Sequence, residues 1–132
     1  MNRAIFALVS LGIALATSAQ DAPVVPVPVR EIEPAELVLK LGEPRLYVFD
    51  CNEADMFQEA HVPGAQLTVY DQVSTSILPK DMDADLVFYC YSPECPAGAT
   101  AAKTAVSLGY TQVFCMTAGI TSWMDAQLRT EP

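Results

Sequence analysis

The segment that most constrains the fold runs from Leu86 to Ala102 and reads LVFYCYSPECPAGATAA. It begins with four apolar residues, typical of a buried strand, and this strand ends at Cys90. After a compact loop, Pro96 opens a run of small residues that predicts a helix ending at Gly109. This order places the Cys90 thiol at the carboxyl edge of a sheet, facing a helix N-terminus that favours a thiolate over a thiol.

Strand-like and helix-like segments alternate along the rest of the chain. Such alternation predicts an α/β domain, with a mainly parallel central sheet of about five strands and helices on both faces. We expect strands at 30–32, 45–50, 66–70, 86–89 and 111–116, helices at 34–41, 53–60, 96–108 and 120–128, and one helical turn around 73–78.

The first 30 residues differ in composition from the rest. Residues 1–3 are positive, 4–16 are apolar and 17–19 are small, which is the pattern of a secretory signal peptide cleaved before Gln20. The apolar run is shorter than the roughly 20 residues that a bilayer span needs. We therefore predict a signal peptide at 1–19, a Pro/Val-rich lead-in at 20–30 and the domain at 31–132. The protein would be exported, to a periplasm or the outside, without stable membrane insertion.

The net charge of the chain limits the kinds of molecule that it can bind. The whole sequence has a formal net charge of −9, every acidic residue follows Gln20, and Arg3 precedes it. Cleavage would leave six Lys and Arg against sixteen Asp and Glu, about −10. Such a surface repels phosphate backbones, so nucleic acid is excluded as a partner.

The four cysteines do not form the pattern of a disulfide-rich scaffold. Export would allow two disulfides, but Cys51 and Cys115 lie in or beside apolar strand-like runs, where a free cysteine acts as a small buried hydrophobe. The sequence holds a single histidine, His61, so we predict no metal site. No cofactor is predicted either.

Four motifs resemble the rhodanese-like family. Residues 50–65, DCNEADMFQEAHVPGA, are similar to that family's D-V-R, its acidic helix with an aromatic, and its G-H-I/V-P-G-A. Tyr89-Cys90 matches the end of the family's active-site strand. LGY at 108–110 matches the segment where the family's next helix ends, and AGITSW at 118–123 matches its G-G-x-x-x-W. The match spans about 34–132 and implies the three-layer rhodanese-like fold. The motif residues that we expect to be structural are Asp50, His61, Gly64, Gly119 and Trp123, with His61 as a turn residue bonded to backbone.

The resemblance implies sulfur transfer or persulfide handling through Cys90. In such proteins a cysteine thiolate takes a sulfane sulfur from a donor as a persulfide and passes it to an acceptor, inside a loop whose N–H groups surround the sulfur. The partner would be a small sulfur-containing or thiol substrate, or a protein thiol. Besides Cys95, the loop residues implied are Tyr91, Ser92, Pro93, Glu94, Pro96 and Ala97.

The sequence departs from the family where an anionic donor would bind. The family's loop commonly ends in arginine, but the matching position here is Cys95 counted from Cys90, or Ala97 counted back from the helix exit. The arginine of D-V-R is Asn52, and Glu94 adds a negative charge to the loop. We therefore predict that thiosulfate is a poor donor.

Cys95 opens two further interpretations of the loop. As a resolving thiol it would close a disulfide with Cys90 or take a sulfur from it, which describes a thiol–disulfide redox protein; as a capping residue it would have no chemistry. The chain could also be a non-catalytic module that binds a partner through this loop. A disulfide needs Cα atoms roughly 4.4–6.8 Å apart. We expect the loop to hold them farther apart, and Cys90 to be free or persulfidated more often than bonded to Cys95.

Overall fold

The computed structural model describes residues 12–14 and 27–132. Apart from 12–14, the predicted signal peptide lies outside the described residues, and the Pro/Val-rich lead-in is described only from Val27. None of the helices in this described part is long and apolar enough to cross a bilayer.

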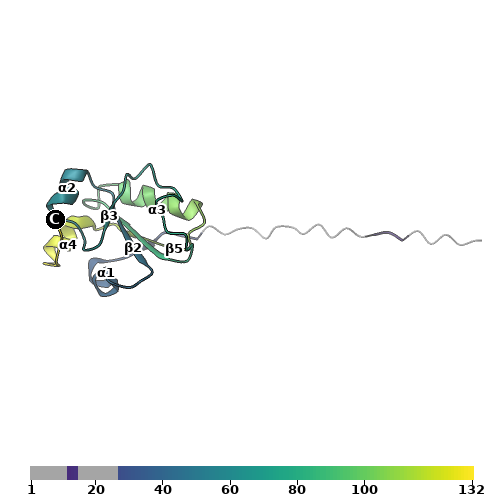
Figure 1. Cartoon of the computed structure of the whole chain (residues 1–132), viewed down its shortest axis with the longest axis horizontal. Coiled ribbons are helices and arrows are strands. Elements are labelled where there is room, and N and C mark those ends of the chain that lie inside the picture. Colours follow the sequence, from purple (N-terminus) through teal and green to yellow (C-terminus); the bar gives the residue numbers. More distant parts are fainter. Residues whose placement is uncertain (1–11, 15–26) are drawn as a thin grey trace, which may run out of the picture.

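A five-stranded sheet forms the centre of the domain (Figure 1). Its strand order is β1-β5-β4-β2-β3, and each neighbouring pair is parallel, which confirms the predicted α/β class. The strands are β1 (Arg30–Glu31), β2 (Leu46–Asp50), β3 (Gln66–Leu67), β4 (Asp85–Tyr89) and β5 (Gln112–Met116), and the helices are α1 (Pro34–Lys40), α2 (Ala54–Glu59), α3 (Ala97–Ser107) and α4 (Gly119–Asp125).

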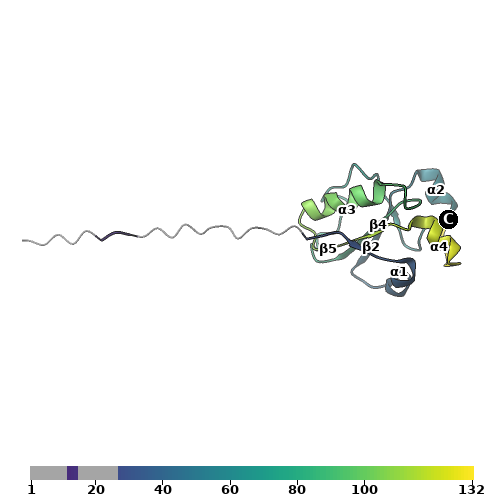
Figure 2. The ribbon, with the colours of Figure 1, turned by 180° about the vertical axis from the view of Figure 1, so that it is seen from behind.

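The central strands feed two hydrophobic cores, one on each face of the sheet. In β4, Leu86 and Phe88 pack with α3, whereas Val87 and Tyr89 pack on the other face with Trp123 of α4. Alternate side chains of a strand point to opposite faces, so a strand covered on both sides is apolar throughout. The two views agree that α3 lies on one side of the sheet and α1 on the other (Figures 1 and 2).

Small residues let α3 approach the sheet closely. Gly98, Ala101 and Ala105 are buried on its inner face. A Cβ at Gly98 would lie 3.0 Å from the Cα of Tyr89, so the start of the helix sits directly on the end of β4. The run of small residues therefore places the N-terminus of α3 beside Cys90.

The structure differs from the sequence-based expectation at element ends. Only the first two residues of the extended piece at 66–70 form a strand. The expected helical turn around 73–78 is present as a single turn, in which Leu78 N–H donates to the carbonyl of Ser74 at 3.2 Å, and it does not extend into a helix. Helix α4 ends at Asp125 because the chain reverses at Gln127, whose φ is 59°.

Candidate active site

Cys90 follows β4 directly, at the carboxyl edge of the sheet, as the sequence predicts. Because Asp50 pairs with Tyr89, the residues that follow them, Cys51 and Cys90, lie next to each other. The N–H of Cys51 donates to the carbonyl of Tyr89 at 2.8 Å. The sequence pattern predicts Cys51 only as a buried core residue. Its position directly after a strand is the feature that indicates a place at the carboxyl edge of the sheet, beside Cys90.

The structure joins Cys90 to Cys95 in a disulfide. Their Cα atoms are 6.1 Å apart, within the range of roughly 4.4–6.8 Å found for disulfides. The expectation that the loop holds them too far apart is therefore wrong. The reason is a tight turn, in which the N–H of Cys95 donates to the carbonyl of Ser92 at 3.0 Å and brings the chain back toward Cys90.

The start of α4 fixes the first half of this loop. The N–H groups of Ile120 and Thr121 donate to the carbonyls of Cys90 and Tyr91 at 3.0 and 3.1 Å. Gly119 has a φ of 74°, and a Cβ there would overlap the carbonyl group of Tyr91. Only glycine fits both conditions, so Gly119 supports the loop that carries Cys90.

A pocket of about 480 Å³ opens beside the disulfide. Cys90 is only 7% exposed and Cys95 is partly exposed, and both residues line this pocket. Its wall includes the start of α3 and the segment that follows β2. The lining residues are Cys51, Asn52, Glu53, Met56, Tyr70, Cys90, Tyr91, Cys95, Pro96 and Ala97.

Three of the loop residues implied by the resemblance do not line this pocket: Ser92, Pro93 and Glu94. The Glu94 side chain is exposed, and its carboxylate accepts a hydrogen bond from the Ser92 hydroxyl at 2.7 Å, which lowers the pKa of Glu94. Its charge is therefore held on the outer side of the loop. The acidic residue among the lining residues is Glu53, which was not among the predicted site residues.

Oxygen atoms, not cations, lie close to the sulfur of Cys90. The Oδ1 of Asn52 is 3.7 Å from Cys90 Sγ, and the carbonyl oxygen of Cys51 is 4.0 Å away. Asp50 fixes the amide, because Asn52 Nδ2 donates to Asp50 Oδ1 at 2.7 Å and leaves Oδ1 toward the sulfur. No Lys or Arg is among the described lining residues. This environment favours an uncharged sulfur over an anion.

The other two cysteines, Cys51 and Cys115, are free and buried. Burial, with a smaller contribution from the Asp50 charge, raises the pKa of Cys51 to about 12. Burial also raises the pKa of Cys115. Both thiols stay protonated at neutral pH, so the cysteine chemistry of the site is confined to the bonded pair.

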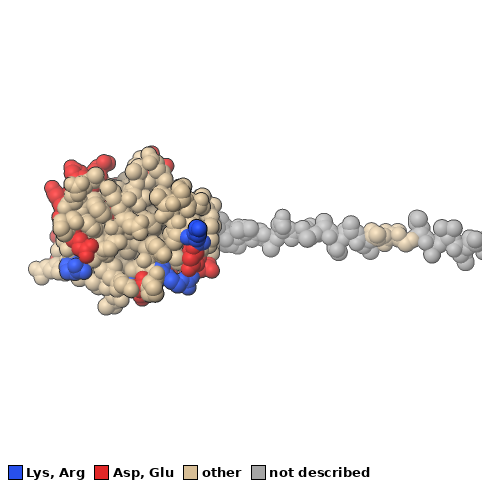
Figure 3. All heavy atoms as spheres, viewed as in Figure 1, with Lys and Arg blue, Asp and Glu red and all other residues tan. Residues whose placement is uncertain are grey.

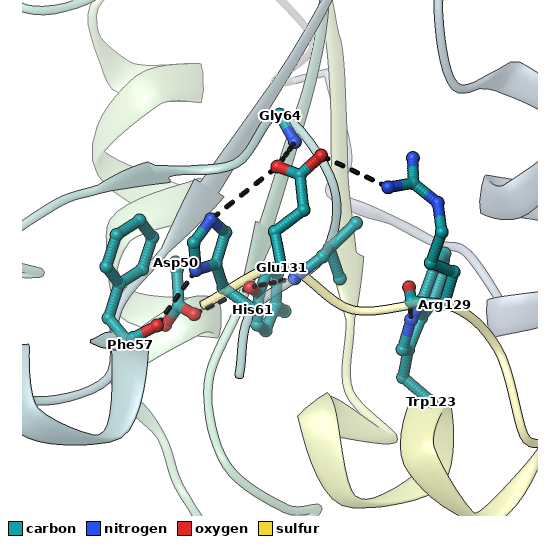
Figure 4. Close-up of polar contacts among 9 residues, drawn as sticks. Asp50, Phe57, His61, Gly64, Trp123, Arg129 and Glu131 are labelled. Carbon is teal, nitrogen blue, oxygen red and sulfur yellow. Dashed lines mark hydrogen bonds and ion pairs between the residues drawn. The ribbon is translucent and has the colours of Figure 1, made fainter. Parts of the chain in front are cut away.

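His61 has a structural role, as the sequence predicts (Figure 4). Its Nδ1–H donates to the carbonyl of Phe57 at 2.8 Å, and its ring stacks on that of Phe57 with centroids 3.8 Å apart. Its backbone pairs with Glu131 through two hydrogen bonds of 2.8 and 2.9 Å. This side chain is therefore held by backbone and by stacking, as part of the scaffold.

The C-terminal tail closes the same network (Figure 4). The indole N–H of Trp123 donates to the carbonyl of Arg129 at 2.9 Å. Arg129 Nη1 lies 3.4 Å from Glu131, whose other carboxylate oxygen accepts the Gly64 N–H at 3.1 Å. The tail thus ties α4 to the turn that contains Gly64.

Asp50 is fully buried and fully hydrogen-bonded. Its carboxylate accepts the Tyr89 hydroxyl at 2.6 Å and the Asn52 N–H at 2.8 Å, and the Tyr89 oxygen in turn accepts the Val62 N–H at 3.0 Å. Burial raises the pKa of Asp50, although these hydrogen bonds act in the opposite direction. Burial likewise raises the pKa of Tyr89.

Fold and site together define a class: an α/β thiol protein with paired cysteines at the carboxyl edge of a parallel sheet, where such sheets place their sites. The family model described as the rhodanese-like domain matches residues 33–126, and the chain belongs to this family. In the part of the chain that the structure describes, no three His, Cys, Asp or Glu side chains gather as metal ligands would.

Similar proteins include sulfurtransferases. The thiosulfate sulfurtransferase GlpE of Pseudoalteromonas translucida is 24% identical over 97 residues, which are 74% of this chain and 90% of that protein. A thiosulfate sulfurtransferase structure from Pseudomonas aeruginosa has a TM-score of 0.67 and 27% identity, over 81% of this chain and 20% of that one. The BH2092 protein of Bacillus halodurans has a TM-score of 0.68 and 24% identity, over 77% and 76% of the two chains, and shows the fold.

Proposed function

We propose that this protein transfers sulfane sulfur through Cys90. The reduced thiol takes a sulfur atom from a small donor, holds it as a persulfide and gives it to a thiol acceptor. One observation carries the proposal: in a family with sulfurtransferase relatives, Cys90 directly follows the central strand β4 and lines an open pocket beside the start of α3. The pocket gives the outer sulfur of a persulfide room next to Cys90.

The pocket's charge indicates which donor it accepts. Glu53 is an acidic residue among those that line it, and no Lys or Arg is among the described lining residues. Acidic side chains also gather near α2 on the face seen in Figure 3, and this short helix carries Asp55 and Glu59. A dianion such as thiosulfate is repelled there more strongly than an alkyl persulfide, whose sulfur carries a single negative charge.

A second candidate function is thiol–disulfide exchange through Cys90 and Cys95. The observation that favours it is the disulfide itself, in a chain whose N-terminus carries a signal-peptide pattern. Disulfides persist in oxidising compartments. For this second function the substrate is a protein or small-molecule dithiol, and no sulfane sulfur is involved.

Export is part of the proposal. It is supported by the composition of residues 1–19 and by a disulfide that a reducing cytosol would open. N-terminal sequencing of protein from its native compartment should begin at Gln20. A mature protein that still begins with Met1 would reject export by cleavage.

The test of sulfur transfer is a peptide mass measurement. Reduced protein, freed of reductant, is mixed with a small alkyl persulfide and quenched with acid at successive short times. The peptides are scanned for one added sulfur, which marks the Cys90 persulfide before any onward reaction. We expect wild type to react and Cys90→Ser to remain unmodified, whereas Cys115→Ala, which removes a buried thiol outside the pocket, behaves as wild type. Sulfur uptake by Cys90→Ser equal to that of wild type rejects Cys90 as the acceptor.

A further inference from the structure

We infer that Cys95 is the acceptor for the Cys90 persulfide, and that the chain converts sulfane sulfur into free sulfide by closing the Cys90–Cys95 disulfide. The inference rests on the proposed function, because it needs a persulfide on Cys90. It goes further by naming the product, sulfide, and by combining the two candidate functions as successive steps of one reaction.

The first support is proximity. Cys95 Sγ bonds to Cys90 Sγ, across a Cα separation of 6.1 Å. An external thiol must enter the pocket to reach Cys90, which is 7% exposed, whereas the Cys95 thiol belongs to the same loop. A nucleophile held in place reacts far faster than one that must diffuse in.

Backbone hydrogen bonds hold the loop in a conformation that keeps Cys95 next to Cys90. The turn from Ser92 to Cys95 is closed by a 3.0 Å backbone hydrogen bond, and the Ser92 hydroxyl is bonded to Glu94. At its other end the loop is held by α4, whose Thr121 N–H donates to the Tyr91 carbonyl. Hydrogen bonds at both ends limit the positions that the Cys95 thiol can take.

Electrostatics gives the step its direction. A persulfide is acidic and carries a negative charge at neutral pH, and the N-terminus of α3 favours that charge. Two features disfavour that charge: Asn52 Oδ1 lies 3.7 Å from Cys90 Sγ, and the acidic residue Glu53 is among those that line the pocket. Closing the disulfide replaces a bound anion with an uncharged bond, and the negative charge leaves with the sulfide.

The step balances without an oxidant. The Cys95 thiolate attacks Cys90 Sγ, a sulfur–sulfur bond forms, and the bond from Sγ to the outer sulfur breaks. The outer sulfur takes up the proton that the Cys95 thiol gives up on becoming a thiolate, and it leaves with the electron pair as hydrosulfide. In this step the Cys95 sulfur is oxidised and the outer sulfur is reduced, while Cys90 Sγ keeps its oxidation level. A dithiol reductant, oxidised in turn to its own disulfide, reopens the pair for the next cycle.

The experiment follows one turnover with labelled sulfur. Reduced protein, freed of reductant, receives one equivalent of an alkyl persulfide whose outer sulfur is a heavy isotope, and labelled sulfide and peptide masses are measured over time. The variants are Cys95→Ser, Cys95→Ala in case the first fails to fold, and Cys115→Ala as a control outside the pocket. Donor incubated with Cys90→Ser gives the background.

We expect wild type and Cys115→Ala to release labelled sulfide and to gain the Cys90–Cys95 disulfide. The Cys95 variants should keep the labelled sulfur on Cys90 and release sulfide at least about tenfold more slowly. If wild type retains the label on Cys90 as long as the Cys95 variants do, this inference is wrong and the proposed function stands. If neither wild type nor the Cys95 variants take up label or release it above background, both are wrong.

Discussion

Two neighbouring regions beyond the ends of β2 and β4 differ in how they use polar groups. The first, the scaffold network of Asp50, Tyr89, His61 and Glu131, pairs its polar groups internally; among the described residues every buried side-chain nitrogen and oxygen has a partner. The second, the cysteine loop from 90 to 97, borders an open pocket. Three residues of the first region, Asp50, His61 and Tyr89, match the family's motifs, whereas Cys95 and Glu94 in the second region depart from them.

The boundary between the two regions is one side chain. Asn52 donates its amide hydrogen to Asp50 in the scaffold network and points its oxygen at Cys90. The scaffold network therefore fixes the polar atom nearest to Cys90 Sγ through Asn52, while its own polar groups stay paired with one another. Substitutions in each region should separate stability from reactivity.

The largest effect is expected where the scaffold supports the loop, at Gly119. Gly119→Ala should lower the free energy of unfolding by about 3 kcal/mol or more, since it adds a backbone clash with Tyr91 to the cost of a positive φ. Gly109→Ala is the matched control, because its φ is 102° but a Cβ there meets nothing; it should lose only about 1–2 kcal/mol. Denaturant titration measures both, and equal losses would contradict the loop-support role.

Next comes the hydroxyl at the centre of the scaffold network. Tyr89→Phe leaves Asp50 and the Val62 N–H each short of a buried partner, so it should cost about 2–3 kcal/mol of unfolding free energy. Tyr110→Phe removes one hydrogen bond, to the Pro79 carbonyl, and should cost about 1 kcal/mol. Alkylation of reduced Cys90 should be unchanged in both folded variants. A large change in Tyr89→Phe alone would mean that the two regions are not separable.

The sequence predicted most of the scaffold and little of the loop's geometry. Local patterns suffice for β4, for the small-residue helix α3 and for the position of Cys90 between them. The turn at Ser92 that brings Cys95 to Cys90 depends on backbone angles in a short loop with two prolines, which no periodicity reveals. The pairing of His61 with Glu131 spans 70 residues of sequence and follows from how the tail packs on α4.

A pH dependence should distinguish Asp50 from surface carboxylates. Burial raises the pKa of Asp50 in the folded state, so the folded protein holds this proton more tightly than the unfolded chain. Its contribution is most favourable below the unfolded value near 4 and is lost as pH rises through the folded pKa. The difference in unfolding free energy between wild type and Asp50→Asn should therefore fall as pH rises from 4, then level off. A difference that grows with pH would contradict this assignment.

The smallest effect concerns the donor. Glu53→Gln removes the charge of the acidic residue that lines the pocket and should raise thiosulfate turnover about threefold, the size expected for one partly screened charge. Glu94→Gln is the matched control, since that carboxylate is bonded to Ser92 outside the pocket and should change turnover little. Steady-state assays with thiosulfate and cyanide measure both. Efficient turnover by wild type would show that backbone donors suffice.

The central claim is that Cys90 and Cys95 act as a pair, and mass analysis of protein isolated without reductant tests it most directly. Free thiols are alkylated during denaturation, and the peptides are then compared with a fully reduced sample. We predict a Cys90–Cys95 linked species two hydrogens lighter than the reduced form, with Cys51 and Cys115 alkylated in both samples. Cys90 alkylated as a free thiol in the unreduced sample, or linked to Cys51 instead, would contradict the claim.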